Sequence, residues 1–331
     1  MARSLASVVR LPCARQDGAL YPLRRSSPTS KSTMWPKAVL SHLQSWLSQG
    51  ALHSSLPQKT SGGSCSAHSL SLVSFGSQQV HPAKKLNEDS FFICGNSLGV
   101  SDGVGGVSMY GIDPSQFSRD LMLHAHHCFK MDELEDPVQV LHESYDRIIK
   151  GGVQGSSTAC LVSLSKNVLK AAVVGDSTFM IIRKNRIIFR SPPQQHYFNC
   201  PYQLSSFAGG DHPCDAQSIE YPLRTGDVVI VATDGLFDNL FEGEILEVIA
   251  FLNNVLSPTE TYCVEQYLST ACQFSKEAAF QLVQAAHSAS LCKKTDTPFS
   301  VSARNAGYHY VGGKPDDITV LVSVAVPSAR V

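Results

Sequence analysis

Five short segments of the sequence place an aspartate or glutamate beside an apolar run of the kind that forms a β-strand. In chain order they are Asn87-Glu88-Asp89, Ser101-Asp102-Gly103, Gly175-Asp176-Ser177, residues 233–238 and residues 314–319. Carboxylate oxygens held at strand ends form a rigid, oxygen-rich site of the kind that Mg²⁺ and Mn²⁺ prefer. Two such ions about 3.5–4 Å apart can activate a water and stabilise a displacement at phosphorus.

Each segment alone is explained more simply as a turn. Asp-Gly is a common turn dipeptide, and residues 101–106 also partly resemble a dinucleotide-binding loop. That loop needs a third glycine at a fixed spacing and a βαβ unit, whereas here Asp113-Pro114 starts the next helix too late. Five acidic strand ends in one domain therefore favour a metal site over five independent turns.

The elements that must position these residues can be read from the pattern of apolar residues. Strands are expected at 70–75, 90–94, 98–100, 158–164, 169–174, 179–183, 186–190, 228–232 and 318–326, and helices at 114–130, 137–150, 242–254 and 274–292. Short links such as Gly95-Asn96 and Lys184-Asn185 favour hairpins, and Asp113-Pro114 is a strong helix start. Hairpins interleaved with a few long helices predict an α+β fold of antiparallel sheets flanked by helices.

Composition excludes several classes of protein. Of 331 residues, 43% are hydrophobic and 17% are charged, which is typical of a globular chain rather than of a disordered or collagen-like one. No apolar run is long enough to cross a bilayer, so no integral membrane segment is expected. The ten cysteines form no C-x-x-C pair, which favours free thiols in a reducing compartment over a disulfide framework or a zinc site.

The charge is distributed unevenly along the chain. Residues 1–87 contain ten basic residues and one acid, Asp17, for a net charge of +9, whereas the remainder contains 17 basic and 27 acidic residues, for −10. An acidic body lacks the clustered cations that bind nucleic acid, so no nucleic-acid partner is expected.

The N-terminal segment has the composition of an organellar transit peptide, because it is rich in arginine and serine and poor in acids. We therefore expect a targeting leader and linker at 1–65, a catalytic domain at 66–327 and a short tail at 328–331. This interpretation favours a mitochondrial location, in the matrix, over a plastid, although composition separates these two organelles poorly. A monomer is the expected state. The apolar stripe at 39–47 is either more leader or a docking helix, and a disordered basic tail is the alternative for the whole segment.

The ordered set of motifs resembles the metal-dependent protein phosphatases of the PPM (type 2C) family. The motifs are Asn-Glu-Asp at 87–89, Asp-Gly-x-Gly-Gly at 102–106, Gly-Ser-Ser-Thr-Ala at 155–159, Gly-Asp-Ser at 175–177, Thr-Asp-Gly-Leu-Phe-Asp at 233–238 and Pro-Asp-Asp-Ile-Thr at 315–319. The resemblance covers about residues 66–327. The stretches 110–118, 194–199 and 312–317 look like the small mitochondrial branch of the family, which is related to the T-cell activation phosphatase.

This resemblance implies a sandwich of two antiparallel β-sheets flanked by α-helices. It also implies hydrolysis of phosphoserine and phosphothreonine in proteins by direct attack of a water activated by two Mn²⁺ or Mg²⁺ ions. By the same resemblance Asp102 bridges both metals and the Gly103 carbonyl binds one of them. Asp234 and Asp316 complete the protein ligands of the second metal.

Four further acidic residues receive roles from the resemblance. Glu88 and Asp89 are expected to hold metal-bound waters, and Asp176 and Asp238 match positions that the family uses for a weaker third metal. None of these roles follows from the spacing of the residues alone.

The residues expected to bind phosphate and to donate a proton match the family pattern less completely than the metal ligands do. Lys84 occupies the position where many relatives have a phosphate-binding arginine, with Lys85 as a rival, and an ammonium lacks the two-pronged geometry of a guanidinium. Asp317 stands where many members carry asparagine. Many relatives have a histidine after Asp-Gly, but here that residue is Val104, which leaves His196 or a metal-bound water as the proton donor.

Two other classes of function remain open alongside the phosphatase. One is a catalytically weak binding module with the same fold, although the presence of Asp102, Asp234 and Asp316 argues against it. The other is a hydrolase of small phosphorylated metabolites. The histidines His124 and His127 share one side of an expected helix with His126 nearby, but no third ligand is evident, so a surface role is favoured over a metal site.

Overall fold

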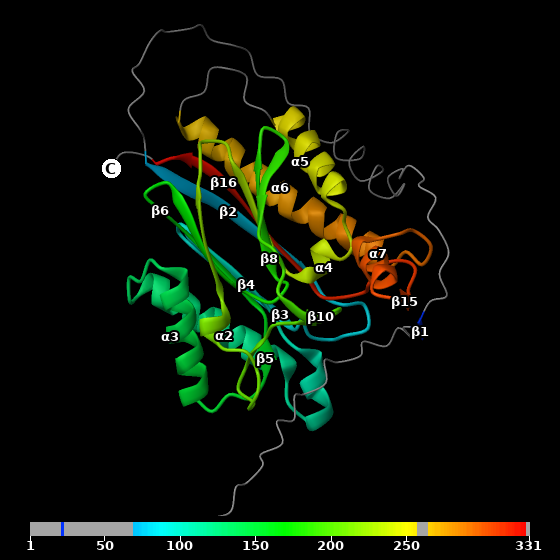
Figure 1. Ribbon diagram of the computed structural model, residues 1–331. Coiled ribbons are helices and arrows are strands. Elements are labelled where there is room, and N and C mark those ends of the chain that lie inside the picture. Colours follow the sequence, from blue (N-terminus) through cyan, green and yellow to red (C-terminus); the bar gives the residue numbers. More distant parts are fainter. Residues whose placement is uncertain (1–20, 23–68, 257–263, 329–331) are drawn as a thin grey trace, which may run out of the picture.

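The computed structural model describes residues 21–22, 69–256 and 264–328, in which two five-stranded antiparallel sheets face each other (Figure 1). The first sheet has the order β13-β7-β6-β4-β3, with β3 (Asp89–Cys94), β4 (Ser97–Asp102), β6 (Ala159–Ser165), β7 (Val168–Val174) and β13 (Gln217–Pro222). The second has the order β2-β16-β14-β8-β9, with β2 (Leu70–Gln79), β8 (Thr178–Arg183), β9 (Arg186–Arg190), β14 (Val228–Ala232) and β16 (Ile318–Pro327). The predicted α+β sandwich is confirmed.

Helices and short pairs of strands complete the described chain. The helices are η1 (Gly105–Tyr110), α2 (Pro114–Lys130), α3 (Pro137–Lys150), η2 (Pro213–Asp215), α4 (Asp234–Phe237), α5 (Glu242–Leu256), α6 (Val264–Ser290) and α7 (Pro298–Asn305). The short pairs are β1 (Tyr21–Pro22) with β15 (Tyr308–His309), β10 (Gln195–Tyr197) with β11 (Cys200–Pro201), and β5 (Ser156–Ser157) with β12 (Leu204–Ser205).

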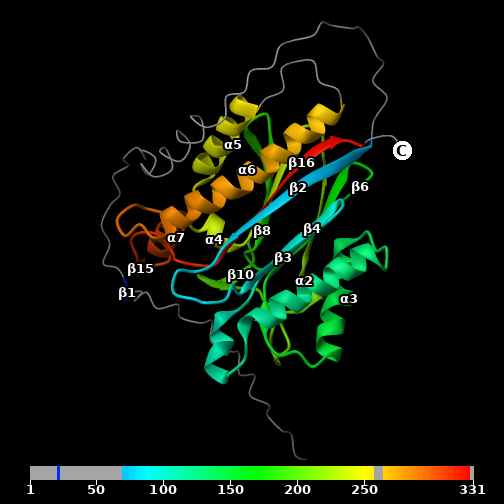
Figure 2. The same ribbon diagram turned by 180° about the vertical axis from the view of Figure 1, so that it is seen from behind.

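The helices cover the outer faces of the two sheets, α2 and α3 on the first and α5 and α6 on the second (Figure 2). Three apolar layers result, with the middle one between the sheets, where Leu98 packs in the same cluster as Val229. Because both faces of β14 are covered, all five of its residues are buried and apolar. This burial explains the continuous apolar runs in the sequence.

Local signals fix the helix starts that were expected from the sequence. The Asp113 side chain accepts a hydrogen bond from the backbone N–H of Ser115 at 2.9 Å, and Pro114 occupies the first turn of α2. The predicted Lys184-Asn185 hairpin is also confirmed, since both residues have positive φ and join β8 to β9.

The strand register brings the acidic strand ends to one edge of the sandwich. Asp89 lies opposite Asp102 in the pairing of β3 with β4, and Ala232 lies opposite Val320 in the pairing of β14 with β16. The end of β14 and the start of β16 therefore lie together, as do the start of β3 and the end of β4.

Some elements differ from the expectation. Helix α6 begins ten residues before the expected position 274, and neither α7 nor β13 was predicted. The apolar stripe at 39–47 lies outside the described residues. No helix within the described ranges has both the length and the apolar composition needed to cross a membrane.

Candidate metal and phosphate site

Acidic side chains from both sheets surround one open pocket with a volume of about 260 Å³. Its charged lining residues are Lys84, Glu88, Asp102, Asp176, Asp234, Lys314 and Asp316, together with the backbone of Gly103. Two of the predicted site residues lie beside the pocket and do not line it. Asp89 lies opposite Asp102 in the sheet, and Asp238 contacts Lys314. Sequence-distant carboxylates therefore meet where the strand ends place them.

Asp102 reaches the pocket at the end of β4, and the next residue must be glycine. The Gly103 N–H donates to the Glu88 carbonyl at 3.1 Å, and a Cβ at Gly103 would lie 2.4 Å from the Pro114 carbonyl oxygen. The Asp102 carboxylate accepts no hydrogen bond from the described residues. Burial, and then the negative charges of Asp89 and Asp234, raise the pKa of Asp102 well above its ordinary value.

Asp89 joins the two sheets beneath the pocket. It is only 6% exposed, and its Oδ2 accepts hydrogen bonds from the hydroxyl groups of Thr233 at 2.9 Å and Thr319 at 2.7 Å. Its Oδ1 is buried without a partner. Burial and the nearby charge of Asp317 raise the pKa of Asp89 to about 8. The residue is therefore a structural link as well as a candidate second layer of the metal site.

The donor set fits hard divalent cations. Oδ1 of Asp234, like that of Asp89, is buried with no hydrogen-bond partner, and such orphaned oxygens are costly unless a cation or water satisfies them. The pKa of Asp176 is raised well above its ordinary value by burial and by the charge of Asp234. No three Asp, Glu, His or Cys side chains of the described chain already stand in metal-binding geometry. Two lysines lie among the carboxylates instead.

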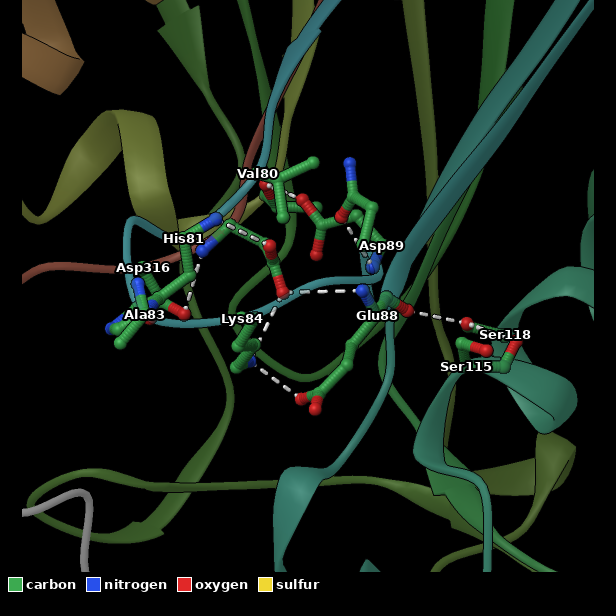
Figure 3. Close-up of polar contacts among 12 residues, drawn as sticks. Val80, His81, Ala83, Lys84, Glu88, Asp89, Ser115, Ser118 and Asp316 are labelled. Atoms are coloured by element: carbon green, nitrogen blue, oxygen red, sulfur yellow. Dashed lines mark hydrogen bonds and ion pairs between the residues drawn. The ribbon is translucent and has the colours of Figure 1, made fainter.

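The first of these lysines, Lys84, joins the loop after β2 to the start of β16. Its Nζ lies 2.6 Å from Oε2 of Glu88 and 3.0 Å from Oδ2 of Asp317, and Figure 3 shows Lys84 and Glu88 pointing toward each other. Burial acts to lower the pKa of Lys84, but its contacts with Glu88 and Asp317 outweigh burial and raise it. Lys85 is exposed and does not line the pocket, so Lys84 is the better candidate for phosphate binding.

The contacts of Asp317 suit an aspartate better than the asparagine that the family resemblance leads one to expect at this position. It is 1% exposed and accepts from the N–H of His81 at 2.8 Å and from the N–H of Glu88 at 3.1 Å, in addition to Lys84. A carboxylate can accept all three bonds, whereas an asparagine would present one NH₂ group to these donors. The buried carboxylate therefore also neutralises the Lys84 ammonium.

The second lysine, Lys314, was not predicted to belong to the site. Its side chain is 7% exposed, and its Nζ contacts Oδ2 of Asp234, lies 2.7 Å from Oδ2 of Asp238 and lies 3.2 Å from Oδ2 of Asp316. The only sequence signal is a lysine directly before two aspartates, and such a lysine is ordinarily a surface residue. The sequence pattern gives no indication that it turns inward.

Known proteins resemble this chain over most of the described body. A probable protein phosphatase 2C 55 of Arabidopsis thaliana is 40% identical over 78% of this chain and 53% of its own length. A probable protein phosphatase 2C 80 of the same plant is 34% identical over 94% of this chain and 70% of its own length. The human protein phosphatase PTC7 homolog is 37% identical over 69% of this chain and 74% of its own length. The chain belongs to the protein phosphatase 2C family.

Solved structures agree with this family membership, although no family profile matches the chain. The photosystem II phosphatase PBCP has a TM-score of 0.65 and 33% identity, with 76% of this chain and 98% of that one covered. The catalytic domain of PstP, solved in complex with two manganese ions, has a TM-score of 0.51 at 16% identity over 78% of this chain and 100% of that one, which supports the fold alone. The relatives named PTC7 homolog place the chain in that branch of the protein phosphatase 2C family.

The histidine considered as a proton donor in this phosphatase lies in a neighbouring pocket. Nε2 of His196 is 3.0 Å from both carboxylate oxygens of Asp211, and its ring stacks on Tyr202 with centroids 4.1 Å apart. His196 lines a cavity of about 80 Å³ next to the acidic pocket but does not line the acidic pocket itself. Val104 does line the acidic pocket, and its side chain carries no donor.

We expect the His196→Gln substitution to lower kcat by less than about threefold, both on an aryl phosphate and on a phosphothreonine peptide. A donor of the leaving-group proton is typically worth about 10²–10⁴-fold on a poor leaving group and little on an aryl phosphate. The measurement is kcat on both substrates as a function of pH. A large loss confined to the phosphothreonine peptide, together with loss of the acid-dependent limb, would make His196 the donor.

We also expect the metal-free protein to lose stability as the pH rises from about 6 to 9. Burial raises the pKa of Asp89 to about 8 and that of Asp238 to about 7, whereas an unfolded aspartate titrates near 3.9. The folded state therefore retains protons that the unfolded chain has released, and its stability declines up to the folded pKa. Thermal unfolding in chelator at pH 6 and at pH 8.5 measures this difference. A melting temperature that is equal or higher at pH 8.5 would contradict it.

Proposed function

We propose that this chain is a divalent-metal-dependent phosphatase that hydrolyses phosphoserine and phosphothreonine in proteins. The observation that carries the proposal is the convergence of carboxylates from both sheets on one pocket, with buried oxygens that lack partners and a lysine at the rim. This set suits two hard cations and a phosphate group, and family membership supports it.

In this proposal Asp102, Asp234 and Asp316 hold two Mn²⁺ or Mg²⁺ ions, with the Gly103 carbonyl as a further ligand. When bound, such ions lower the pKa of water and neutralise charge that develops on phosphate. Lys84 binds the phosphate oxygens of the substrate, and Glu88 orients water at the pocket wall. A water attacks phosphorus directly, the bond to the serine or threonine oxygen breaks, and that oxygen takes up a proton from water, so no enzyme side chain becomes phosphorylated.

The direct test is hydrolysis by the purified chain with and without Mn²⁺, using a chromogenic phosphate ester, a panel of phosphopeptides and a panel of phosphorylated metabolites. We expect metal-dependent hydrolysis with the highest kcat/KM on phosphopeptides. Preference for a metabolite would favour the small-molecule hydrolase. Binding of phosphopeptides without hydrolysis, at saturating Mn²⁺, would favour the binding module.

We further propose that the enzyme acts in mitochondria, in the matrix, and that residues 1–65 carry it there. The basic, serine-rich composition of this segment supports the proposal. A fluorescent reporter fused to residues 1–65 should enter mitochondria, and a matched fusion with the arginines of the segment replaced by glutamine should not. A diffuse cytosolic signal from the first fusion would contradict this location.

A further inference from the structure

Hydrogen bonds to the Asn239 side chain fix the backbone of Lys314. The Lys314 N–H donates to Oδ1 of Asn239 at 2.9 Å, and Nδ2 of Asn239 donates to the Lys314 carbonyl at 2.9 Å. The preceding residue, Gly313, packs so tightly on α6 that a Cβ there would lie 2.1 Å from the carbonyl oxygen of Ala289. The loop is thus fixed against a helix, and the lysine side chain enters the site from the interior.

The ammonium group is surrounded on its other sides. Besides the three carboxylates of Asp234, Asp238 and Asp316, the Phe299 ring lies with its centroid 5.2 Å from Nζ, at a distance suited to a cation–π contact. The two carboxylate oxygens of Asp234 have different surroundings: Oδ2 contacts Lys314, whereas Oδ1 is buried with no hydrogen-bond partner. One oxygen of Asp234 is therefore committed to the lysine, and the other remains for a metal ion.

We propose that the Lys314 ammonium is a permanent counterion that takes the place of a third divalent cation, so that this protein binds two metals and not three. The inference rests on the metal centre of the proposed function. The third position expected from the family resemblance is formed by Asp176 and Asp238, and Lys314 already lies 2.7 Å from Asp238. A dication there would face a fixed positive charge and a carboxylate whose oxygen is already bonded.

Metal stoichiometry tests the inference without reference to activity. Free Mn²⁺ is measured by electron paramagnetic resonance during titration of the full chain, its Lys314→Met variant and, as a matched control, a variant of the exposed Lys293, Lys293→Met. We expect two bound ions in the wild type and in the control, and three in Lys314→Met. Without metal, Lys314→Met should melt about 10 °C lower, because buried carboxylates lose their partner. Three ions in the wild type, or two in Lys314→Met, would overturn the inference.

Chemical labelling tests the same point in the wild type, even if Lys314→Met fails to fold. The chain is treated with an amine-acylating reagent, with and without Mn²⁺, and each lysine is followed by mass spectrometry. We expect Lys314 to stay protected in both conditions while Lys293 reacts in both. Acylation of Lys314 on addition of Mn²⁺ would show that metals displace it and would overturn the inference. Absence of any Mn²⁺ binding would overturn the proposed function too, whereas three bound ions would overturn this inference alone.

Discussion

Replacing Asp102 by alanine is expected to lower kcat/KM by at least about 10³-fold while leaving the metal-free protein folded. The carboxylate faces the pocket, accepts no hydrogen bond from the described residues and is crowded by Asp89 and Asp234. Its loss removes a ligand of both proposed metals, which supply several kcal/mol of transition-state stabilisation. It also relieves repulsion among buried like charges, so the melting temperature in chelator should be unchanged or higher.

The Asp234→Ala variant is the informative comparison for Asp102→Ala. It should be equally inactive, but its metal-free form should be less stable than the wild type because Lys314 loses one of its buried partners. The measurements are kcat/KM at saturating Mn²⁺ and the melting temperature in chelator for each variant. Near-normal turnover by either variant would refute the metal assignment.

Replacing Lys84 by methionine is expected to lower kcat/KM on phosphopeptides by about 10- to 100-fold, mainly through a higher KM. A charge-assisted hydrogen bond to phosphate is worth about 1.5–3 kcal/mol, which corresponds to this range. Inhibition by inorganic phosphate should weaken in parallel, since the product contacts the same ammonium. Lys85→Met is the matched control and should change kcat/KM by less than about twofold, because Lys85 is exposed and outside the pocket.

A purely structural role for Lys84 would give a different pattern. Lys84 also neutralises Asp317, which is buried and accepts from the N–H groups of His81 and Glu88. If the lysine only held this loop, Lys84→Met would lower the melting temperature and kcat without changing the inhibition constant of phosphate. The Lys84→Arg variant keeps the charge and should retain most of the phosphate affinity.

Most of the scaffold was predictable because local signals and burial agree. The bounds of α2 and α3 were predicted correctly, and each helix starts with an aspartate cap followed by proline. The missed helix α7 has a related signal, a Thr297 cap before Pro298, but it is only eight residues long. Strand β13 alternates half-buried and exposed residues over 217–222, and because none of them is fully buried its sequence resembles a loop.

The site was predictable to the extent that strand ends determine it. The acidic residues at 88, 102, 234 and 316 meet because antiparallel register places them at one edge, and the order of motifs was enough to indicate this. The inward turn of Lys314 depends on packing of its loop against α6 and on the Asn239 side chain, 75 residues away. Such long-range contacts leave no periodic trace in the sequence.

The position of β16 determines when the site can form during biosynthesis. This strand follows all the others in the described chain, yet it pairs on both sides, between β2 at the edge of its sheet and β14. Asp316 stands directly before it, more than two hundred residues after Asp102. Contacts so distant in sequence form late in folding. A nascent chain, or one threading through a translocation pore, therefore lacks a complete metal centre until β16 has inserted. Under the proposed metal assignment and import, the ion acquired is that of the compartment in which folding ends, not of the one in which the chain is synthesised.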